Sequence, residues 1–312
     1  MKQTLVIGSR GSKLALTQAR LVQSELKRLE PELETRIEII TTSGDVKTEP
    51  LAVIGGKGVF TKELEDALLA RKIDMAVHSL KDLPTVLPED FAIAAICKRE
   101  DPRDALVLGR RGGNAGNASI ENLRPRAIVG TSSPRRLAQL KHLRNDLVFE
   151  DLRGNVDTRL RKLDEGQYDV LVLACAGLRR LGLESRISAA IPTVQMLPSP
   201  GQGAIAIETR VDDQEIIAAL RKLEHKFTRL ACTAERAFLR SLGGGCQLPI
   251  AGYAAVRDKN IKLDGLVSDT QGKQILRDRI SGSIDEAEQL GSVLAERLLA
   301  NGARELLDHS SE

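Results

Sequence analysis

TLVIGSRGSKLALTQARLVQSELKRLEPELETRIEIITT, residues 4–42, sets the pattern that decides the fold. It opens with an apolar strand at residues 4–9 and a turn at residues 10–12. A helix follows, in which apolar residues recur every three or four positions until Pro31 ends it. A second strand at residues 36–41 completes a β-α-β unit.

The same alternation continues along the chain. A helix capped by Thr61 carries Leu64 and Leu68, and an apolar strand follows at residues 73–79. A second run of this kind has strands at residues 127–130, 147–152 and 169–174, separated by helices at residues 134–143 and 156–163. Strands that alternate with helices predict mainly parallel sheets covered by helices, which is an α/β fold.

After residue 222 the order of elements changes. A helix at residues 228–241 precedes strands near residues 253–256, 261–267 and 274–280, and a helix at residues 284–300 follows them. Neighbouring strands flanked by helices predict a C-terminal α+β domain. We therefore predict three domains: residues 1–101 with 202–221, residues 102–201, and residues 222–312.

Composition limits the classes of function. Aromatic residues make up only 2% of the chain and Trp is absent, so the stacking surfaces that bind single-stranded nucleic acid are scarce. The apolar runs are too short to span a bilayer, and the N-terminal segment lacks the layout of a signal peptide. We expect a cytoplasmic protein without a nucleic-acid or membrane partner.

The four cysteines, Cys97, Cys175, Cys232 and Cys246, are widely spaced, and only four histidines accompany them. This spacing predicts no metal site, and disulfides are not expected in a reducing compartment. Cys175 lies in an apolar segment and is expected in the core. Cys246 differs because it follows three glycines in LGGGCQLPI, residues 242–250. We expect an irregular loop that presents its thiol.

Hydroxyl and cationic side chains gather where the predicted strands end, which is where open α/β sheets bind ligands. Residues 124–180 contain twelve Lys and Arg against seven Asp and Glu, a local net charge of +5. Two such sheets facing each other predict a cleft for a small polyanion or polycarboxylate, because arginine binds carboxylates through two hydrogen bonds. The strand-end residues are Ser9, Arg10, Ser12, Ser79, Lys81, Asp82, Thr131, Ser133, Arg135, Arg136, Arg153 and Asn155.

Each of these motifs alone also has a simpler interpretation. GTSSPRR, residues 130–136, is compatible with an ordinary helix start, and LRGNVDTRL, residues 152–160, with an amphipathic helix. Lys81 beside Asp82 resembles a surface ion pair of little energetic value. GGKG, residues 55–58, lacks the spacing of a phosphate-binding loop and is interpreted as a mobile loop. Only the combination of motifs is specific.

Ten motifs occur here in a fixed order: SRGSKLAL, TSGD, GGKGVFTKELE, AVHSLKDLPT, REDPRDALV, GTSSPRR, LRGNVDTRL, AGLRRLGLESRI, LPSPGQGA and GGGCQLPIAGYA. Over essentially its whole length the chain resembles the porphobilinogen deaminase (hydroxymethylbilane synthase) family. The resemblance implies a monomeric transferase of tetrapyrrole biosynthesis. It would join porphobilinogen units head to tail into hydroxymethylbilane and release ammonia at each addition. It also implies a dipyrromethane cofactor held by a thioether.

The resemblance assigns roles to individual residues. Cys246 would attach the cofactor, Asp82 would be the catalytic carboxylate, and Lys57 and Phe60 would belong to a mobile active-site loop. Each pyrrole carries an acetate and a propionate, so an arginine-lined cleft would neutralise them. The implied cofactor-binding residues are Cys246, Lys81, Thr131, Ser133, Arg135, Arg136, Arg153 and Asn155, and the substrate-binding residues are Arg10, Ser12, Arg153, Arg159 and Arg180.

Two other classes of protein fit part of the pattern. A non-catalytic solute-binding protein also has two α/β lobes around an anion-binding cleft, and both α/β domains predicted here are of this periplasmic-binding-protein-like kind. The absence of a signal-peptide pattern and the glycine–cysteine loop argue against that function. A basic nucleic-acid-binding protein is disfavoured by the scarce aromatic residues.

Overall fold

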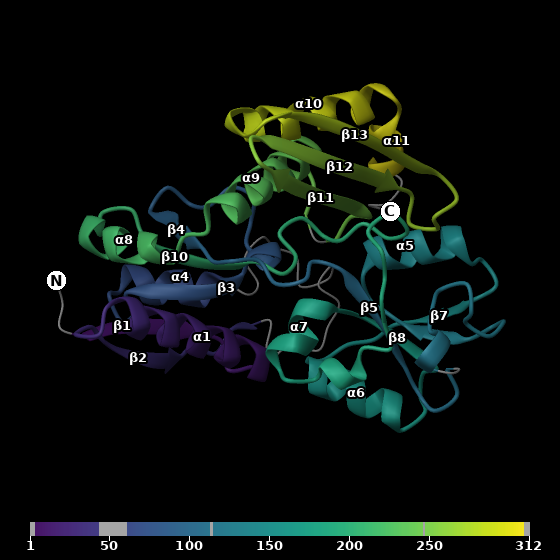
Figure 1. The fold of residues 1–312 in the computed structure, drawn as a ribbon, viewed down its shortest axis with the longest axis horizontal. Helices are drawn as coiled ribbons and strands as arrows, with labels where there is room; N and C mark the ends of the chain where they lie inside the picture. The colour runs from purple at the N-terminus through teal and green to yellow at the C-terminus, as the bar shows by residue number, and fades with distance from the viewer. Residues whose placement is uncertain (1–3, 44–60, 113–114, 246, 309–312) are drawn as a thin grey trace. The chain divides into compact units, whose positions relative to one another are not determined.

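The computed structural model describes residues 4–43, 61–112, 115–245 and 247–308. By the density of its internal contacts the chain divides into two compact units, Met1–Glu100 with Ala204–Arg229, and Asp101–Gly203 with Leu230–Glu312. The first unit contains one five-stranded sheet, and the second contains a five-stranded and a three-stranded sheet (Figure 1). The boundaries of the three domains stay predictions.

The sheet of the first unit has the order β2-β1-β3-β10-β4. Strand β1 is parallel to β2 and β3, whereas β10 is antiparallel to β3 and β4. Apolar residues of α1 and α8 pack on one face and those of α4 on the other. The elements are β1 (Thr4–Ser9), α1 (Lys13–Leu29), β2 (Glu34–Ile39), α4 (Lys62–Leu69), β3 (Met75–Ser79), η1 (Leu80–Asp82), β4 (Phe91–Ile96), β10 (Ile205–Arg210), α8 (Gln214–Leu220) and η4 (Arg221–Leu223).

The five-stranded sheet of the second unit has the order β7-β6-β8-β5-β9 and repeats this plan. Strand β6 is parallel to β7 and β8, and β5 is antiparallel to β8 and β9. Its elements are β5 (Asp104–Leu108), η2 (Ala115–Asn117), β6 (Ile128–Gly130), α5 (Pro134–Leu143), β7 (Val148–Glu150), α6 (Val156–Asp164), β8 (Val170–Ala174), α7 (Cys175–Arg180), η3 (Glu184–Arg186) and β9 (Ala189–Ala190).

The α/β class is therefore confirmed, together with the three parallel strands predicted for each sheet. Each sheet also has two strands that the sequence pattern did not predict, namely β10 and β4 in the first unit and β5 and β9 in the second. In each pair only one strand, β10 or β5, runs antiparallel to the other strands of its sheet. Strands β10 and β5 therefore bring their N-terminal ends to the sheet edge at which the parallel strands finish. This arrangement matters for the site described below.

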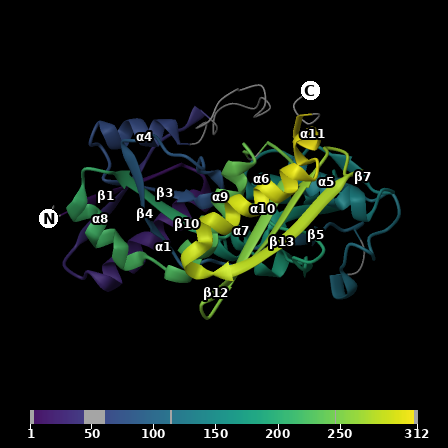
Figure 2. The same ribbon diagram turned by 90° about the horizontal axis from the view of Figure 1, so that it is seen from above.

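The three-stranded sheet is an antiparallel β11-β12-β13 meander, and α10 lies along it (Figure 2). Its core joins Phe238 of α9 to Leu263 and Leu294, all fully buried. Gly291 allows α9 and α10 to approach closely, because a Cβ there would lie 2.3 Å from the Ala234 carbonyl oxygen. The predicted α+β fold is confirmed, with elements α9 (Lys226–Ser241), β11 (Ile250–Arg257), β12 (Asn260–Ser268), β13 (Ile275–Ser283), η5 (Ile284–Glu286), α10 (Ala287–Ala300) and α11 (Ala303–Asp308).

Among the helices that the structure describes, none combines the length and the apolar character required to cross a membrane.

Candidate active site

Four of the sequence-predicted site residues follow β1 and β3 in the first unit. These strands are parallel neighbours, with Ile7 opposite Met75 and Gly8 opposite Ala76, so the chain leaves both at the same sheet edge. This edge collects two cations, a hydroxyl and a carboxylate within a few residues of the strand ends. They are Arg10, Ser12, Lys81 and Asp82.

Asp82 is held by a short 3-10 turn that directly follows β3. Leu80 in this turn is fully buried and anchors it, whereas the Asp82 side chain is exposed. Gln18 of α1 donates from Nε2 to the Ser79 Oγ at 2.9 Å, which fixes the end of β3 against the helix. Ser12 caps α1 by accepting from the Ala15 amide at 3.2 Å. Asp82 is therefore an accessible carboxylate on a firmly anchored turn.

The second unit brings three further segments to one sheet edge, because β7 and β8 are both parallel to β6. Thr131 and Ser133 follow β6, and the Thr131 Oγ1 accepts from the Ser133 amide at 3.2 Å. Arg153 and Asn155 follow β7, where Asn155 is the N-cap residue of α6. Arg180 ends α7, the helix that follows β8.

The arginines of these segments donate hydrogen bonds to carboxylate or carbonyl groups of the same unit. Arg153 donates from Nε to Asp151 Oδ2 at 2.7 Å, and both side chains are largely exposed. The Arg159 Nε donates to the carbonyl of Gly154 at 2.7 Å, and the Arg180 Nη2 to the carbonyl of Gly203 at 2.6 Å. Such contacts orient the guanidinium groups, each of which carries five N–H groups.

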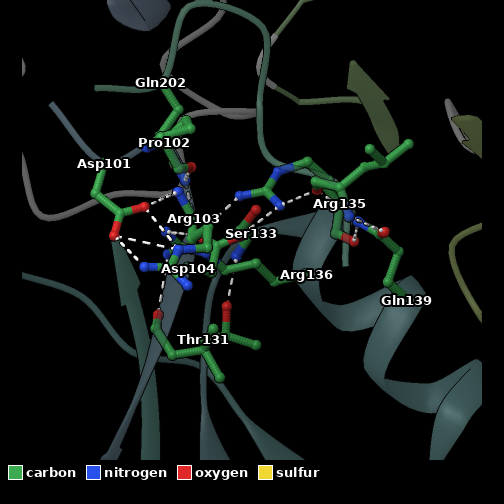
Figure 3. A network of polar contacts seen from close by, with 12 residues as sticks. Asp101, Pro102, Arg103, Asp104, Thr131, Ser133, Arg135, Arg136, Gln139 and Gln202 are labelled. Carbon is green, nitrogen blue, oxygen red and sulfur yellow. Dashed lines mark hydrogen bonds and ion pairs between the residues drawn. The ribbon is translucent and has the colours of Figure 1, made fainter. Parts of the chain in front are cut away.

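Arg135 and Arg136, in the first turn of α5, are buried with 5% and 6% of their surface exposed. Both bind the carboxylate of Asp104, which is fully buried at the start of β5 (Figure 3). Arg135 Nη1 lies 2.7 Å from Oδ2, and Arg136 donates to Oδ1 from Nη2 at 2.7 Å and from Nε at 2.9 Å. One carboxylate thus serves two guanidinium groups.

Amide and carbonyl groups complete this cluster. Gln202 donates from Nε2 to Asp104 Oδ1 at 3.0 Å and to the carbonyl of Pro102 at 2.7 Å. The Leu197 carbonyl accepts from Arg135 at 2.7 Å and from Gln139 at 3.0 Å. Nearly all the polar atoms of the cluster are therefore paired, as burial demands.

Charges set the ionisation state of the cluster. Burial by itself raises the pKa of Asp104, but the charges of Arg135 and Arg136 outweigh it and hold the pKa far below its ordinary value. Asp104 is therefore ionised at neutral pH. Two guanidinium groups against one carboxylate leave one excess positive charge in a buried position. Such a charge favours binding of a further anion.

The structure leaves part of the predicted site untested. Cys246, Lys57 and Phe60 lie outside the described residues. Of the described cysteines, Cys97, Cys175 and Cys232 form no disulfide. Cys175 is buried as predicted, and burial raises the pKa of its thiol to about 12.

Sequence reasoning missed Asp104 and Gln202 as members of the site. The available signal was an acid at the start of the apolar segment DALVL, residues 104–108. An ionisable side chain next to a buried strand requires a partner of opposite charge, which the sequence alone does not name.

The comparisons with known proteins cover nearly the whole chain. Residues 5–218 match the family model described as "Porphobilinogen deaminase, dipyromethane cofactor binding domain", and residues 229–300 match "Porphobilinogen deaminase, C-terminal domain". The chain is 50% identical over 303 residues to the porphobilinogen deaminase of Synechococcus elongatus, covering 97% of this chain and 94% of that protein. It is 48% identical to that of Syntrophus aciditrophicus, covering 97% of both.

The solved structures that match the chain are more distant. The VFT2 domain of Bordetella pertussis BvgS has a TM-score of 0.42 at 14% identity, covering 71% of this chain and 86% of that one. A probable amino-acid ABC transporter extracellular-binding protein of Bacillus subtilis has a TM-score of 0.40 at 15% identity, covering 71% of this chain and 92% of that one. On the two family models and the near full-length relatives together, the chain belongs to the porphobilinogen deaminase family.

Proposed function

We propose that this enzyme polymerises porphobilinogen with Asp82 as its catalytic carboxylate and Cys246 as the attachment point of its cofactor. The reaction joins porphobilinogen units head to tail into hydroxymethylbilane with release of ammonia, in tetrapyrrole biosynthesis. The observation that supports the assignment of this reaction is the match of both family models, over residues 5–218 and 229–300. The alternative of a non-catalytic solute-binding protein is not favoured, because the near full-length relatives from Synechococcus elongatus and Syntrophus aciditrophicus are porphobilinogen deaminases.

The residues of the second unit suit the dipyrromethane cofactor of this family. Its rings, built from substrate, carry acetate and propionate groups, and the sheet edge offers guanidinium and hydroxyl donors for them. The excess positive charge around Asp104 adds a reason for an anionic ligand to bind. When bound, the cofactor supplies the end from which the pyrrole chain grows. The proposed ligands of the cofactor carboxylates are Thr131, Ser133, Arg135, Arg136, Arg153 and Asn155 of the second unit, together with Lys81 of the first unit.

The accessibility of Asp82 in the first unit supports its proposed catalytic role. Its side chain is exposed on the anchored turn after β3, so a substrate can reach it. As ammonia leaves porphobilinogen, positive charge develops on the pyrrole, and a fixed carboxylate stabilises it. The same carboxyl group can pass a proton to the departing amine.

Substrate carboxylates are assigned to a second set of donors. Arg10 and Ser12 follow β1 at the edge that also holds Asp82, and Arg153, Arg159 and Arg180 lie at the edge of the second sheet. Guanidinium groups orient carboxylates through paired hydrogen bonds, so these arginines would hold the substrate in place and take no part in the chemical step. Lys57 and Phe60 are assigned to the active-site loop on the basis of the motif alone.

A cytoplasmic location, a monomeric state and a thioether link through Cys246 are part of the proposal. Three successive glycines before Cys246 leave its loop with few side chains to obstruct a bulky cofactor.

The decisive experiment is the intact mass of the purified protein. We expect an excess equal to one dipyrromethane, located by peptide mapping on Cys246 and absent from the Cys246→Ser variant. Cys232→Ser is the matched control, because Cys232 is fully buried in α9, and it should keep the excess mass. A fully active preparation with unmodified mass would contradict the proposal.

A further inference from the structure

Asp104 reaches the candidate site from a strand that runs opposite to the others. It is the first residue of β5, and in the antiparallel register it lies across from Ala174, the last residue of β8. The parallel strands β6 and β8 end at this same edge, where α5 and α7 begin. The topology thus places a buried carboxylate among the cationic segments that follow the parallel strands.

The hydrogen bonds of Asp104 fix the orientation of both arginines. Each guanidinium donates to it from two nitrogens, and Figure 3 shows the two groups meeting at this one carboxylate. Arg135 Nη1, which also donates to Asp104, donates to the Leu197 carbonyl at 2.7 Å, and Arg136 Nη1 donates to the Val172 carbonyl at 3.0 Å. A guanidinium held on two sides has few orientations open to it, so its remaining N–H groups point in defined directions.

A second buried aspartate in the same sheet has a different setting. Asp169, also fully buried, precedes β8 and therefore lies at the opposite end of that strand. Its Oδ2 accepts from Arg124 at 2.6 Å and from the Ile128 amide at 2.8 Å. Only the Arg124 side chain of this pair is exposed, at 47%, and the pair lies at the end of β8 away from Asp104.

We propose that Asp104 is a positioning residue of the enzyme. Its carboxylate binds both Arg135 and Arg136 and so holds the two guanidinium groups side by side. Because it neutralises only one of their two charges, the pair presents a single oriented positive charge to a carboxylate of the pyrrole chain. Gln202 supports this role by holding Asp104 Oδ1. This inference rests on the proposed function and adds a residue to its binding machinery.

The test compares Asp104→Asn with Asp169→Asn. Each substitution removes one buried negative charge from the same sheet, and both should lower the unfolding temperature. Apoprotein of each variant is incubated with porphobilinogen, and the gain of cofactor mass is followed with time. We expect Asp104→Asn to assemble cofactor about tenfold more slowly or worse, and Asp169→Asn to assemble it at the wild-type rate.

Steady-state kinetics supply the second readout. In the fraction of Asp104→Asn that carries cofactor, KM for porphobilinogen should rise about tenfold while kcat changes less, because binding rather than chemistry is impaired. If Asp104→Asn does not fold, Gln202→Ala replaces it, since that variant keeps all three charges and should raise KM by a smaller factor.

Two results would overturn the inference. One is a variant Asp104→Asn, or Gln202→Ala where that variant is used, that assembles the cofactor at the wild-type rate and has the wild-type KM for porphobilinogen. The other is an equal loss of assembly in Asp169→Asn, which would mean that both aspartates act only through stability. Failure of the proposed function is distinguishable, because wild-type protein would then gain no cofactor mass at all.

Discussion

Gly272 lies against the backbone of Ala138, so closely that a Cβ at position 272 would lie 2.1 Å from the Ala138 carbonyl oxygen. Gly272 belongs to the turn between β12 and β13, and Ala138 to α5, the helix that carries Arg135 and Arg136 in its first turn. The Gly272 carbonyl also lies 3.1 Å from Nδ1 of His142 on the same helix. This contact fixes the three-stranded sheet against the helix that carries the buried arginines.

Gly272→Ala should therefore destabilise the second unit strongly. The left-handed backbone angle of Gly272, φ +68°, costs a side-chain-bearing residue about 1–2 kcal/mol, and overlap with backbone adds about 1–3 kcal/mol. Gly182→Ala is the matched control, since Gly182 has the same φ but open space around its Cβ position. Thermal unfolding should show a clearly larger loss for Gly272→Ala. Equal losses would mean that the turn yields without cost.

Asp82→Asn should abolish most of the activity without disturbing the fold. The amide keeps the size of the side chain but has no negative charge and cannot act as a general acid. We therefore expect kcat to fall by about two to four orders of magnitude. Porphobilinogen consumption measures the effect, and intact mass should show that the cofactor is retained. Asp90→Asn, another exposed acid of the first unit, should leave kcat unchanged. Normal turnover by Asp82→Asn would remove Asp82 from the mechanism.

Cys175 should resist alkylation in the folded protein. Burial raises the pKa of its thiol to about 12, so at pH 8 its reactive thiolate is scarcer by about three orders of magnitude than in an ordinary cysteine. Iodoacetamide followed by peptide mass analysis should find Cys97, which is partly exposed, modified well before Cys175. In urea the two should react alike. Rapid labelling of native Cys175 would show that α7 opens readily.

Two glutamates in the first turn of α4 should show opposite pH dependences. Burial raises the pKa of Glu65, and the nearby charge of Glu208 adds to the rise. Ionised Glu65 therefore weakens the fold at neutral pH, and this loss disappears as pH falls below about 4.5. Glu65→Gln should raise the unfolding temperature at pH 7 by on the order of 1 °C, with the gain shrinking on acidification.

Glu63 supplies the contrast on the same helix. Burial alone would raise its pKa, but the Ser43 amide, which donates to its carboxylate at 2.8 Å, lowers it below the ordinary value. Its stabilising contribution is present above about pH 4.5 and is lost as pH falls. Glu63→Gln should therefore lower the unfolding temperature at pH 7. Differential scanning calorimetry at several pH values measures the change of unfolding temperature for both variants. A change of the same sign in both at pH 7 would contradict this explanation.

The sequence by itself determined the three neighbouring parallel strands of each five-stranded sheet, and it indicated the family. Strands such as residues 4–9 and the helix after them carry their period of two or 3.6 residues in the chain itself, and local periodicity does not depend on distant partners. Motifs such as GTSSPRR and LRGNVDTRL also placed hydroxyl, amide and cationic residues at strand ends, and the structure has Thr131, Ser133, Arg153 and Asn155 there.

Only the tertiary structure decided how Arg135 and Arg136 are held. The pattern TSSPRR is equally compatible with a solvated helix start, and nothing local indicates that both side chains are buried. Their partner, Asp104, precedes them by about thirty residues and reaches them because β5 runs antiparallel beside β8. A strand's direction and neighbours follow from the packing of the whole sheet, and burial of a charge follows from whether a partner is present. Both are long-range properties that no short stretch of sequence contains.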